Sequence, residues 1–111
     1  MRKFNGLDIE LTKGDSLQFK VNFAGRELPA EAEALFTVKK RTRDEEPVIE
    51  KRIVIHENAV QIGLSNDDTD ISPRTYYWDI RVLIPLGDGT FEVKTPMEYA
   101  AFTILEVIGN V

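Results

Sequence analysis

The stretch TYYWDIRVLI at residues 75–84 decides the fold of this chain. Apolar and polar side chains alternate along it, with Tyr76, Trp78, Ile80 and Val82 at the even positions and Tyr77, Asp79 and Arg81 at the odd ones. Successive residues of a β-strand point to opposite faces of a sheet, so this period of two predicts a half-buried strand. Two large aromatic rings on the apolar side predict that the strand is central.

Segments with the same period lie on both sides of this strand. The clearest is residues 16–23, in which Leu17, Phe19, Val21 and Phe23 alternate with polar residues. Further strands are expected at residues 7–12, 34–41, 48–55, 59–64 and 101–107, with a short strand around Phe91 and Val93. About seven or eight short strands with almost no helix predict an all-β, immunoglobulin-like antiparallel β-sandwich.

The connections between these segments carry turn-forming residues. Lys13-Gly14-Asp15 ends the first strand, and residues 86–90 form a glycine-rich hairpin turn. Residues 24–32 are expected to form a loop rather than a short helical turn, and residues 65–74 a crossing loop. Lys51 interrupts the apolar row of residues 48–55, which is typical of a guarded edge strand.

The composition fits one globular unit. The chain has 111 residues, of which 42% are hydrophobic and 30% charged, so residues 1–111 are expected to form a single domain. No apolar run approaches the roughly 20 residues that span a bilayer, and the N-terminus lacks an apolar signal core, which predicts cytoplasmic synthesis. The absence of cysteine excludes disulfides and thiolate chemistry.

The charge of the chain argues against a nucleic-acid partner. The net charge is −5, whereas binding to phosphate backbones needs a clustered basic face. The one basic run, residues 39–43, is followed at once by Asp44, Glu45 and Glu46. We therefore expect a solvated hairpin tip.

The inventory of catalytic groups is small. The sole histidine, His56, is expected in a surface turn, with no sequence neighbour that suggests a triad or a metal site. Gly87-Asp88-Gly89 fits a hairpin turn and lacks the lysine of a phosphate-binding loop. The sequence thus predicts no enzyme activity, no catalytic, cofactor-binding or metal-binding residues, and no cofactor.

One acidic cluster, Asp67, Asp68 and Asp70, leaves two interpretations open. Carboxylates on a loop can bind calcium, but this cluster lacks the glycine of a typical ion-binding loop. Local capping of the loop backbone is the favoured interpretation. The sequence alone does not decide whether the cluster binds an ion.

Tyr77 and Arg81, on the polar side of the central strand, also have two interpretations. Tyrosine and arginine are enriched at the centres of protein interfaces, so these side chains could form a contact surface. Alternatively, Tyr77 packs across its own sheet on a neighbouring strand. Both interpretations remain open at this point.

Four segments resemble phage and prophage modules. They are the turn KGDS at residues 13–16, FTVKK at 36–40, LSNDDTDI at 64–71 and YYWDIRV at 76–82. The chain is most similar to the N-terminal immunoglobulin-like domain of tailed-phage upper baseplate proteins. The resemblance implies a sandwich that anchors a receptor-binding assembly, with a tyrosine that bonds backbone at the corner before its strand.

Two departures from that family pattern qualify the resemblance. Such modules often have glycine in the turn before the tyrosine strand, where this chain has Pro73-Arg74-Thr75. The sequence given also shows no receptor-binding segment after Val111. A small baseplate, neck or tail component therefore suits it better than a fusion anchor.

The leading functional hypothesis is a non-catalytic structural protein of a phage or prophage virion. Its expected partners are other virion proteins and copies of itself, with no membrane or nucleic acid and no small-molecule ligand. The alternative is a carbohydrate-binding or adhesion-type sandwich, which would expose aromatic side chains on one sheet or loop rim.

Overall fold

The structure is a computed structural model that describes residues 8–23, 28–95 and 99–108. Within these ranges the chain forms eight β-strands and no helix, so no helix there could cross a membrane. The strands are β1 (Ile9–Thr12), β2 (Leu17–Asn22), β3 (Glu33–Lys39), β4 (Ile49–Val54), β5 (Ala59–Leu64), β6 (Arg74–Pro85), β7 (Phe91–Lys94) and β8 (Ala100–Leu105).

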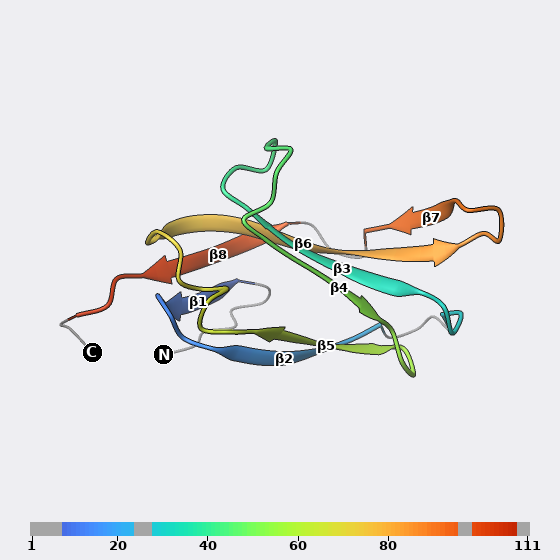
Figure 1. Ribbon diagram of the computed structural model, residues 1–111, viewed down its shortest axis with the longest axis horizontal. Helices are drawn as coiled ribbons and strands as arrows, with labels where there is room; N and C mark the ends of the chain where they lie inside the picture. Colours follow the sequence, from blue (N-terminus) through green and yellow to red (C-terminus); the bar gives the residue numbers. More distant parts are fainter. Residues whose placement is uncertain (1–7, 24–27, 96–98, 109–111) are drawn as a thin grey trace.

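The strands form two layers (Figure 1). The larger layer is a six-stranded sheet in the order β1-β8-β6-β3-β4, with β7 also paired to β6. The smaller layer is the two-stranded sheet β2-β5, which lies against one face of the larger sheet. The all-β class and the number of strands expected from the sequence are confirmed.

The expectation of purely antiparallel sheets is wrong at one strand. β1 runs parallel to β8, with Ile9 opposite Phe102 and Leu11 opposite Ile104, so the large sheet is mixed. The alternation of apolar residues in β1 predicts which face is buried but contains no information on strand direction. After β1 the chain crosses to the other layer and begins β2, so β1 and β2 form no hairpin in one sheet.

The core lies between the two layers and is made by the rows predicted from the alternation. In the large sheet, Phe36 is fully buried and Trp78 is 3% exposed. Phe19 of β2 reaches both of them, with its ring centroid 6.0 Å from that of Phe36 and 6.1 Å from that of Trp78, each in edge-on geometry. The buried rows are Leu17, Val60, Ile62 and Leu64 in the small sheet, and Ala34, Phe36, Val38, Tyr76, Trp78, Ile80 and Val82 in the large one.

The expected edge position of Lys51 is also confirmed. β4 is the last strand of the large sheet, and the Lys51 ammonium lies 2.9 Å from a carboxylate oxygen of Asp68. The expected loop before β3 ends in a turn in which the Ala32 amide donates to the Pro29 carbonyl at 3.0 Å. The last strand ends at Leu105 rather than at residue 107, whereas Leu7 and Pro96 lie outside the described residues.

The crossing loop of residues 65–70 docks on the turn after β1. Thr69 is fully buried, and its hydroxyl donates to the Asp15 carbonyl at 2.6 Å. The Gly14 amide donates to the Thr69 carbonyl at 3.2 Å, and the Asn66 side-chain amide donates to the Gly14 carbonyl at 2.7 Å. Two segments far apart in the sequence thus satisfy each other's backbone groups.

β6 is the longest strand and pairs along both of its edges. Leu83 lies opposite Glu33 of β3 on one edge and opposite Val93 of β7 on the other. β8 pairs with the same edge of β6 as β7 does, but the register changes. The pairs Val82–Lys94 and Trp78–Ala100 are separated by three residues within β6 and by five residues in the chain from β7 to β8. The two partner strands are therefore out of step by two residues.

Two tight turns require unusual backbone angles. In the β6–β7 turn, Gly87 and Gly89 adopt φ values of 84° and 89°, as the glycine-rich sequence predicted. In the β4–β5 turn, Glu57 and Asn58 adopt φ values of 52° and 57°. Asparagine tolerates this left-handed region, whereas glutamate does not favour it.

Replacing Glu57 by glycine should stabilise the fold. Glycine adopts the observed angle without steric penalty, so we expect the free energy of unfolding to rise by about 0.5–1 kcal/mol in chemical denaturation. Asn58→Gly is the matched variant, and it should not stabilise because the Asn58 side chain accepts a hydrogen bond from the Leu28 amide at 2.9 Å. A loss of stability in Glu57→Gly would contradict the strain assigned to that residue.

Replacing Thr69 by valine should destabilise the fold by about 0.5–1.5 kcal/mol, because the hydrogen bond from the buried Thr69 hydroxyl to the Asp15 carbonyl is lost. Thr69→Ser retains the hydroxyl and should keep most of the stability. Urea denaturation of the two variants measures the difference. Equal losses in the two variants would contradict a dominant role of the hydroxyl bond, because they would show that the methyl group contributes as much.

Candidate functional site: the outer groove of the large sheet

The face of the large sheet that points away from β2-β5 is lined by the odd-numbered residues of β3 and β6. Tyr77 stands opposite Lys39, Asp79 opposite Thr37, and Arg81 opposite Leu35. The sequence alternation that buries Trp78 and Ile80 necessarily turns these neighbours outward. The structure therefore places the predicted surface residues Tyr77 and Arg81 on one exposed face.

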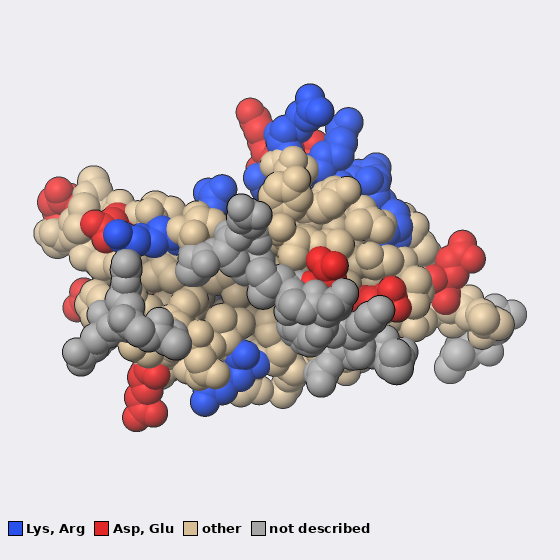
Figure 2. Space-filling view, turned by 180° about the vertical axis from the view of Figure 1, so that it is seen from behind, with Lys and Arg blue, Asp and Glu red and all other residues tan. Residues whose placement is uncertain are grey.

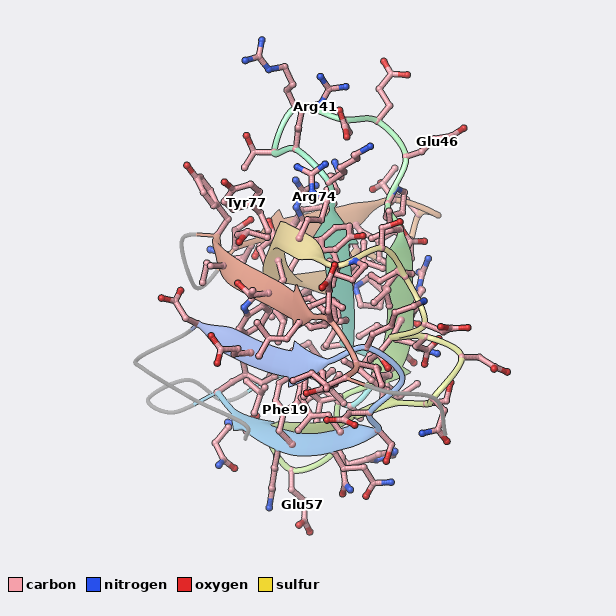
Figure 3. All side chains as sticks on the ribbon, turned by 90° about the vertical axis from the view of Figure 1, so that its left-hand side faces the viewer. Phe19, Arg41, Glu46, Glu57, Arg74 and Tyr77 are labelled. Atoms are coloured by element: carbon pink, nitrogen blue, oxygen red, sulfur yellow. The ribbon has the colours of Figure 1, made fainter. Side chains whose placement is uncertain are left out.

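A groove of about 280 Å³ runs over this face. The hairpin of residues 40–48 projects on the side of the large sheet away from the β2-β5 layer, and it carries the labelled residues Arg41 and Glu46 (Figure 3). This hairpin supplies one wall of the groove, and Tyr99 contributes at the β8 side. The lining residues are Leu35, Thr37, Lys39, Thr42, Glu45, Pro47, Glu50, Tyr77, Trp78, Asp79, Arg81 and Tyr99.

The two tyrosines of the groove form an aromatic pair. The ring centroids of Tyr77 and Tyr99 are 5.6 Å apart and the rings are perpendicular, a favourable edge-to-face geometry. Tyr77 therefore does pack on a neighbouring segment of its own sheet, while Tyr99 is 60% exposed. The packing interpretation of Tyr77 is thus confirmed, whereas its role in a contact surface stays a prediction. The packed pair lines the open groove.

Charged side chains of opposite sign are paired along the same face. Arg52 of β4 donates two hydrogen bonds to the Glu33 carboxylate, at 2.9 and 3.1 Å. The hydrogen bond from Arg52 lowers the pKa of Glu33 below its ordinary value, and the hydrogen bond to Glu33 raises the pKa of Arg52. Arg81 and Asp79 approach to 4.0 Å. These pairs orient the side chains of the face without leaving a strong net charge.

The hairpin tip beyond the groove is exposed, as the sequence predicted, and carries basic and acidic side chains together. Figure 2 shows lysine and arginine side chains gathered on the projecting hairpin, with acidic side chains beside them. Arg41 pairs with Asp44, with 3.2 Å between Nε and Oδ1. Arg74 spreads over the Tyr76 ring at 5.5 Å and donates to the Lys40 carbonyl at 3.3 Å, which ties the hairpin to β6.

The acidic cluster of the crossing loop is divided between two lysines. Asp68 accepts a hydrogen bond from the Ser65 amide at 2.8 Å and forms an ion pair with Lys51 at 2.9 Å. Asp70 pairs with Lys13 on the other side of the loop. The favoured interpretation of backbone capping is thus confirmed for Asp68, whereas Asp67 is exposed.

The environment of Asp68 shifts its proton affinity. Partial burial alone would raise the pKa of this carboxyl, but the hydrogen bonds from Ser65 and the ammonium of Lys51 together outweigh burial and lower the pKa. The carboxylate form is therefore the one that stabilises the fold.

His56 lies in the exposed turn that the sequence predicted. Its amide and carbonyl exchange hydrogen bonds with Ala59 at 3.0 and 2.9 Å, which closes the β4–β5 turn. Over residues 8–23, 28–95 and 99–108, no group of three histidine, aspartate or glutamate side chains is arranged to hold a metal ion. The outer face combines an edge-to-face tyrosine pair, a guanidinium and carboxylates in one groove, and tyrosine and arginine are enriched at protein interfaces.

Comparison of this chain with protein-family models, with curated proteins and with solved structures finds no match. The candidate site therefore rests on the geometry alone. Sequence reasoning identified Tyr77 and Arg81 but missed Tyr99, Pro47 and Glu50. The one available signal was that Tyr99 shares the odd positions of Ala101 and Thr103, opposite to the buried Phe102 and Ile104.

Replacing Asp68 by asparagine should lower the free energy of unfolding by about 1 kcal/mol at pH 7, because the Lys51 ion pair is lost. The pKa of Asp68 is lower in the folded state than in the unfolded state. The contribution of this carboxylate to stability is therefore complete above its unfolded-state pKa of about 3.9 and disappears as the pH falls through its folded-state pKa. Denaturation curves of wild type and variant should thus converge below about pH 4. Asp67→Asn is the control and should show no such convergence.

Proposed function

We propose that this chain is an immunoglobulin-like β-sandwich that acts as a non-catalytic assembly protein of a phage or prophage virion, and that it binds a partner protein through the outer groove. The observation that carries the proposal is the aromatic and charged groove of Tyr77, Tyr99 and Arg81 on an otherwise well-satisfied fold. Tyrosine and arginine are the side chains most enriched at the energetic centres of protein interfaces.

The order of strands supports the immunoglobulin-like assignment. β2 and β5 correspond to the B and E strands of one sheet, and the order β8-β6-β3-β4 corresponds to G, F, C and C′ of the other. Tyr76, near the start of β6, donates its hydroxyl to the Ser72 carbonyl at 2.6 Å, in the manner of a tyrosine corner. One departure is the core tryptophan, which antibody domains have on strand C and this chain has on β6.

The virion role is supported by the segments that resemble upper baseplate proteins. Two of them, residues 13–16 and 64–71, dock on each other through the bond from Thr69 to Asp15. A third, residues 76–82, contributes the corner tyrosine and the outward Tyr77 and Arg81. The resembling residues thus include both structural elements and side chains that line the groove, which fits a module that presents a contact face.

The proposal predicts that the chain is a component of assembled particles and needs the groove for incorporation. Particles from cells that encode this chain should contain it after density-gradient purification, as measured by mass spectrometry. Arg81→Glu should reduce incorporation by about tenfold or more, the range expected for truncating or reversing a central interface arginine. Lys20→Glu makes the same change of charge on exposed β2, in the other layer, and should incorporate normally.

Circular dichroism of both variants separates loss of binding from loss of folding. If the chain is absent from purified particles, or if both variants incorporate equally, the proposed role is wrong.

A second candidate, carbohydrate binding, is favoured by the perpendicular tyrosine pair beside Asp79 and Glu50, since sugars stack on aromatic rings and hydrogen-bond to carboxylates. Calorimetric titration with oligosaccharides tests it. Saturable heat that disappears in Tyr99→Ala would replace the assembly role with this one.

A further inference from the structure

β7 presents an open edge of the large sheet. It pairs with β6 on one side, and no other described strand pairs with its second edge. All four of its residues are exposed, in contrast to the half-buried pattern of the other strands. The β6–β7 hairpin also extends beyond the β2-β5 layer (Figure 1), so a partner strand can approach it.

The backbone groups that face this open edge follow from the hairpin turn. The Leu86 amide donates to the Thr90 carbonyl at 3.0 Å. Hydrogen-bonded and non-hydrogen-bonded pairs alternate along an antiparallel ladder, so the pairs Ile84–Glu92 and Val82–Lys94 are hydrogen-bonded. Phe91 and Val93 therefore direct their N–H and C=O groups away from β6, toward the open edge.

The other long edge of the sheet is tied to the second layer by a salt bridge, and the β7 edge is not. Edge strands are usually protected by lysine, proline, bulges or charges that lean inward. β4 has Lys51, which leans toward the inner side and pairs with Asp68. β7 has the sequence FEVK and no proline. Its Glu92 and Lys94 lie opposite Ile84 and Val82, on the inner side of the sheet, but they pair with each other rather than with the second layer.

The charges of β7 are complementary to those of a second, antiparallel β7. Glu92 and Lys94 lie on the same face of the strand, with 3.7 Å between Oε1 and Nζ. If two copies meet with Val93 opposite Val93, Glu92 of each copy stands opposite Lys94 of the other. Shifting the register by two residues would instead oppose two glutamates or two lysines, which is unfavourable. The charge pattern thus selects one register.

We propose that the β7 edge binds β7 of a second copy of this chain, antiparallel, about a twofold axis through Val93. In this register the outward-facing groups of Val93 form the hydrogen-bonded central pair, as the ladder requires. The contact is isologous and therefore closes as a dimer. Exposed Phe91, Val93 and Leu86, at 41, 54 and 57% exposure, add apolar surface beside the ladder.

This pairing goes beyond the assembly role proposed above, because it uses a surface distinct from the groove and names the partner. It joins two six-stranded sheets into one and leaves both outer grooves on the sheet faces. The dimer would therefore offer two binding grooves to the virion partner, which strengthens attachment through bivalency.

Cysteine cross-linking tests the contact directly, since the chain contains no cysteine of its own. Residues of a hydrogen-bonded antiparallel pair have Cα atoms about 5.5 Å apart, within disulfide reach. Val93→Cys should form a covalent dimer under mild oxidation. Val107→Cys, at an exposed valine outside β7, is the control and should remain mostly monomeric. Equal cross-linking of the two variants, or none in Val93→Cys, would overturn the proposal.

Charge reversal tests the register. Glu92→Lys and Lys94→Glu should each weaken dimerisation by about tenfold, and the double reversal should restore it, as measured by sedimentation over a range of concentrations. A wild-type chain that stays monomeric throughout, or a double variant that does not recover, would overturn the pairing. The Arg81→Glu variant should still dimerise. Loss of partner binding at the groove and loss of dimerisation at the β7 edge are therefore measured separately.

Discussion

The contact of Phe19 with Phe36 and Trp78 is the interaction on which the rest of the structure depends. A two-stranded sheet is at most marginally stable in water, so β2-β5 persists because its apolar row is buried on the larger layer. The three rings meet with centroids 5.5–6.1 Å apart and fill the space between the layers. Removing water from this region fixes which side of β3 and β6 faces inward, and therefore which side chains form the outer groove.

The sequence predicted the buried rows well because burial imposes a period of two that survives in the residues themselves. The bounds of β5 agree with the predicted residues 59–64, and Trp78 is buried as expected. Strand direction produces no such pattern in the sequence, so the parallel pairing of β1 with β8 was not predicted. The hydroxyl of Thr69 was likewise unpredictable, because its partner Asp15 is distant in the sequence.

The same distinction separates the predicted part of the candidate site from the rest. Tyr77 and Arg81 were found because alternation along one strand places them outward. Tyr99 and Glu50 join them only through pairing between strands, which depends on register rather than on local pattern. Capping by Asp68 is local and was foreseen, whereas its ion pair with Lys51 spans two elements and was not.

The two-residue offset between β7 and β8 has a consequence for how sequences of this type can diverge in length. Because the offset is even, Val93 and Tyr99 both lie on the outer side of the sheet. Inserting one residue would turn the following side chains to the opposite face unless a bulge accommodated the extra residue. Inserting two residues would leave every side chain on its original face. Natural variation at this position should therefore favour insertions and deletions that come in pairs.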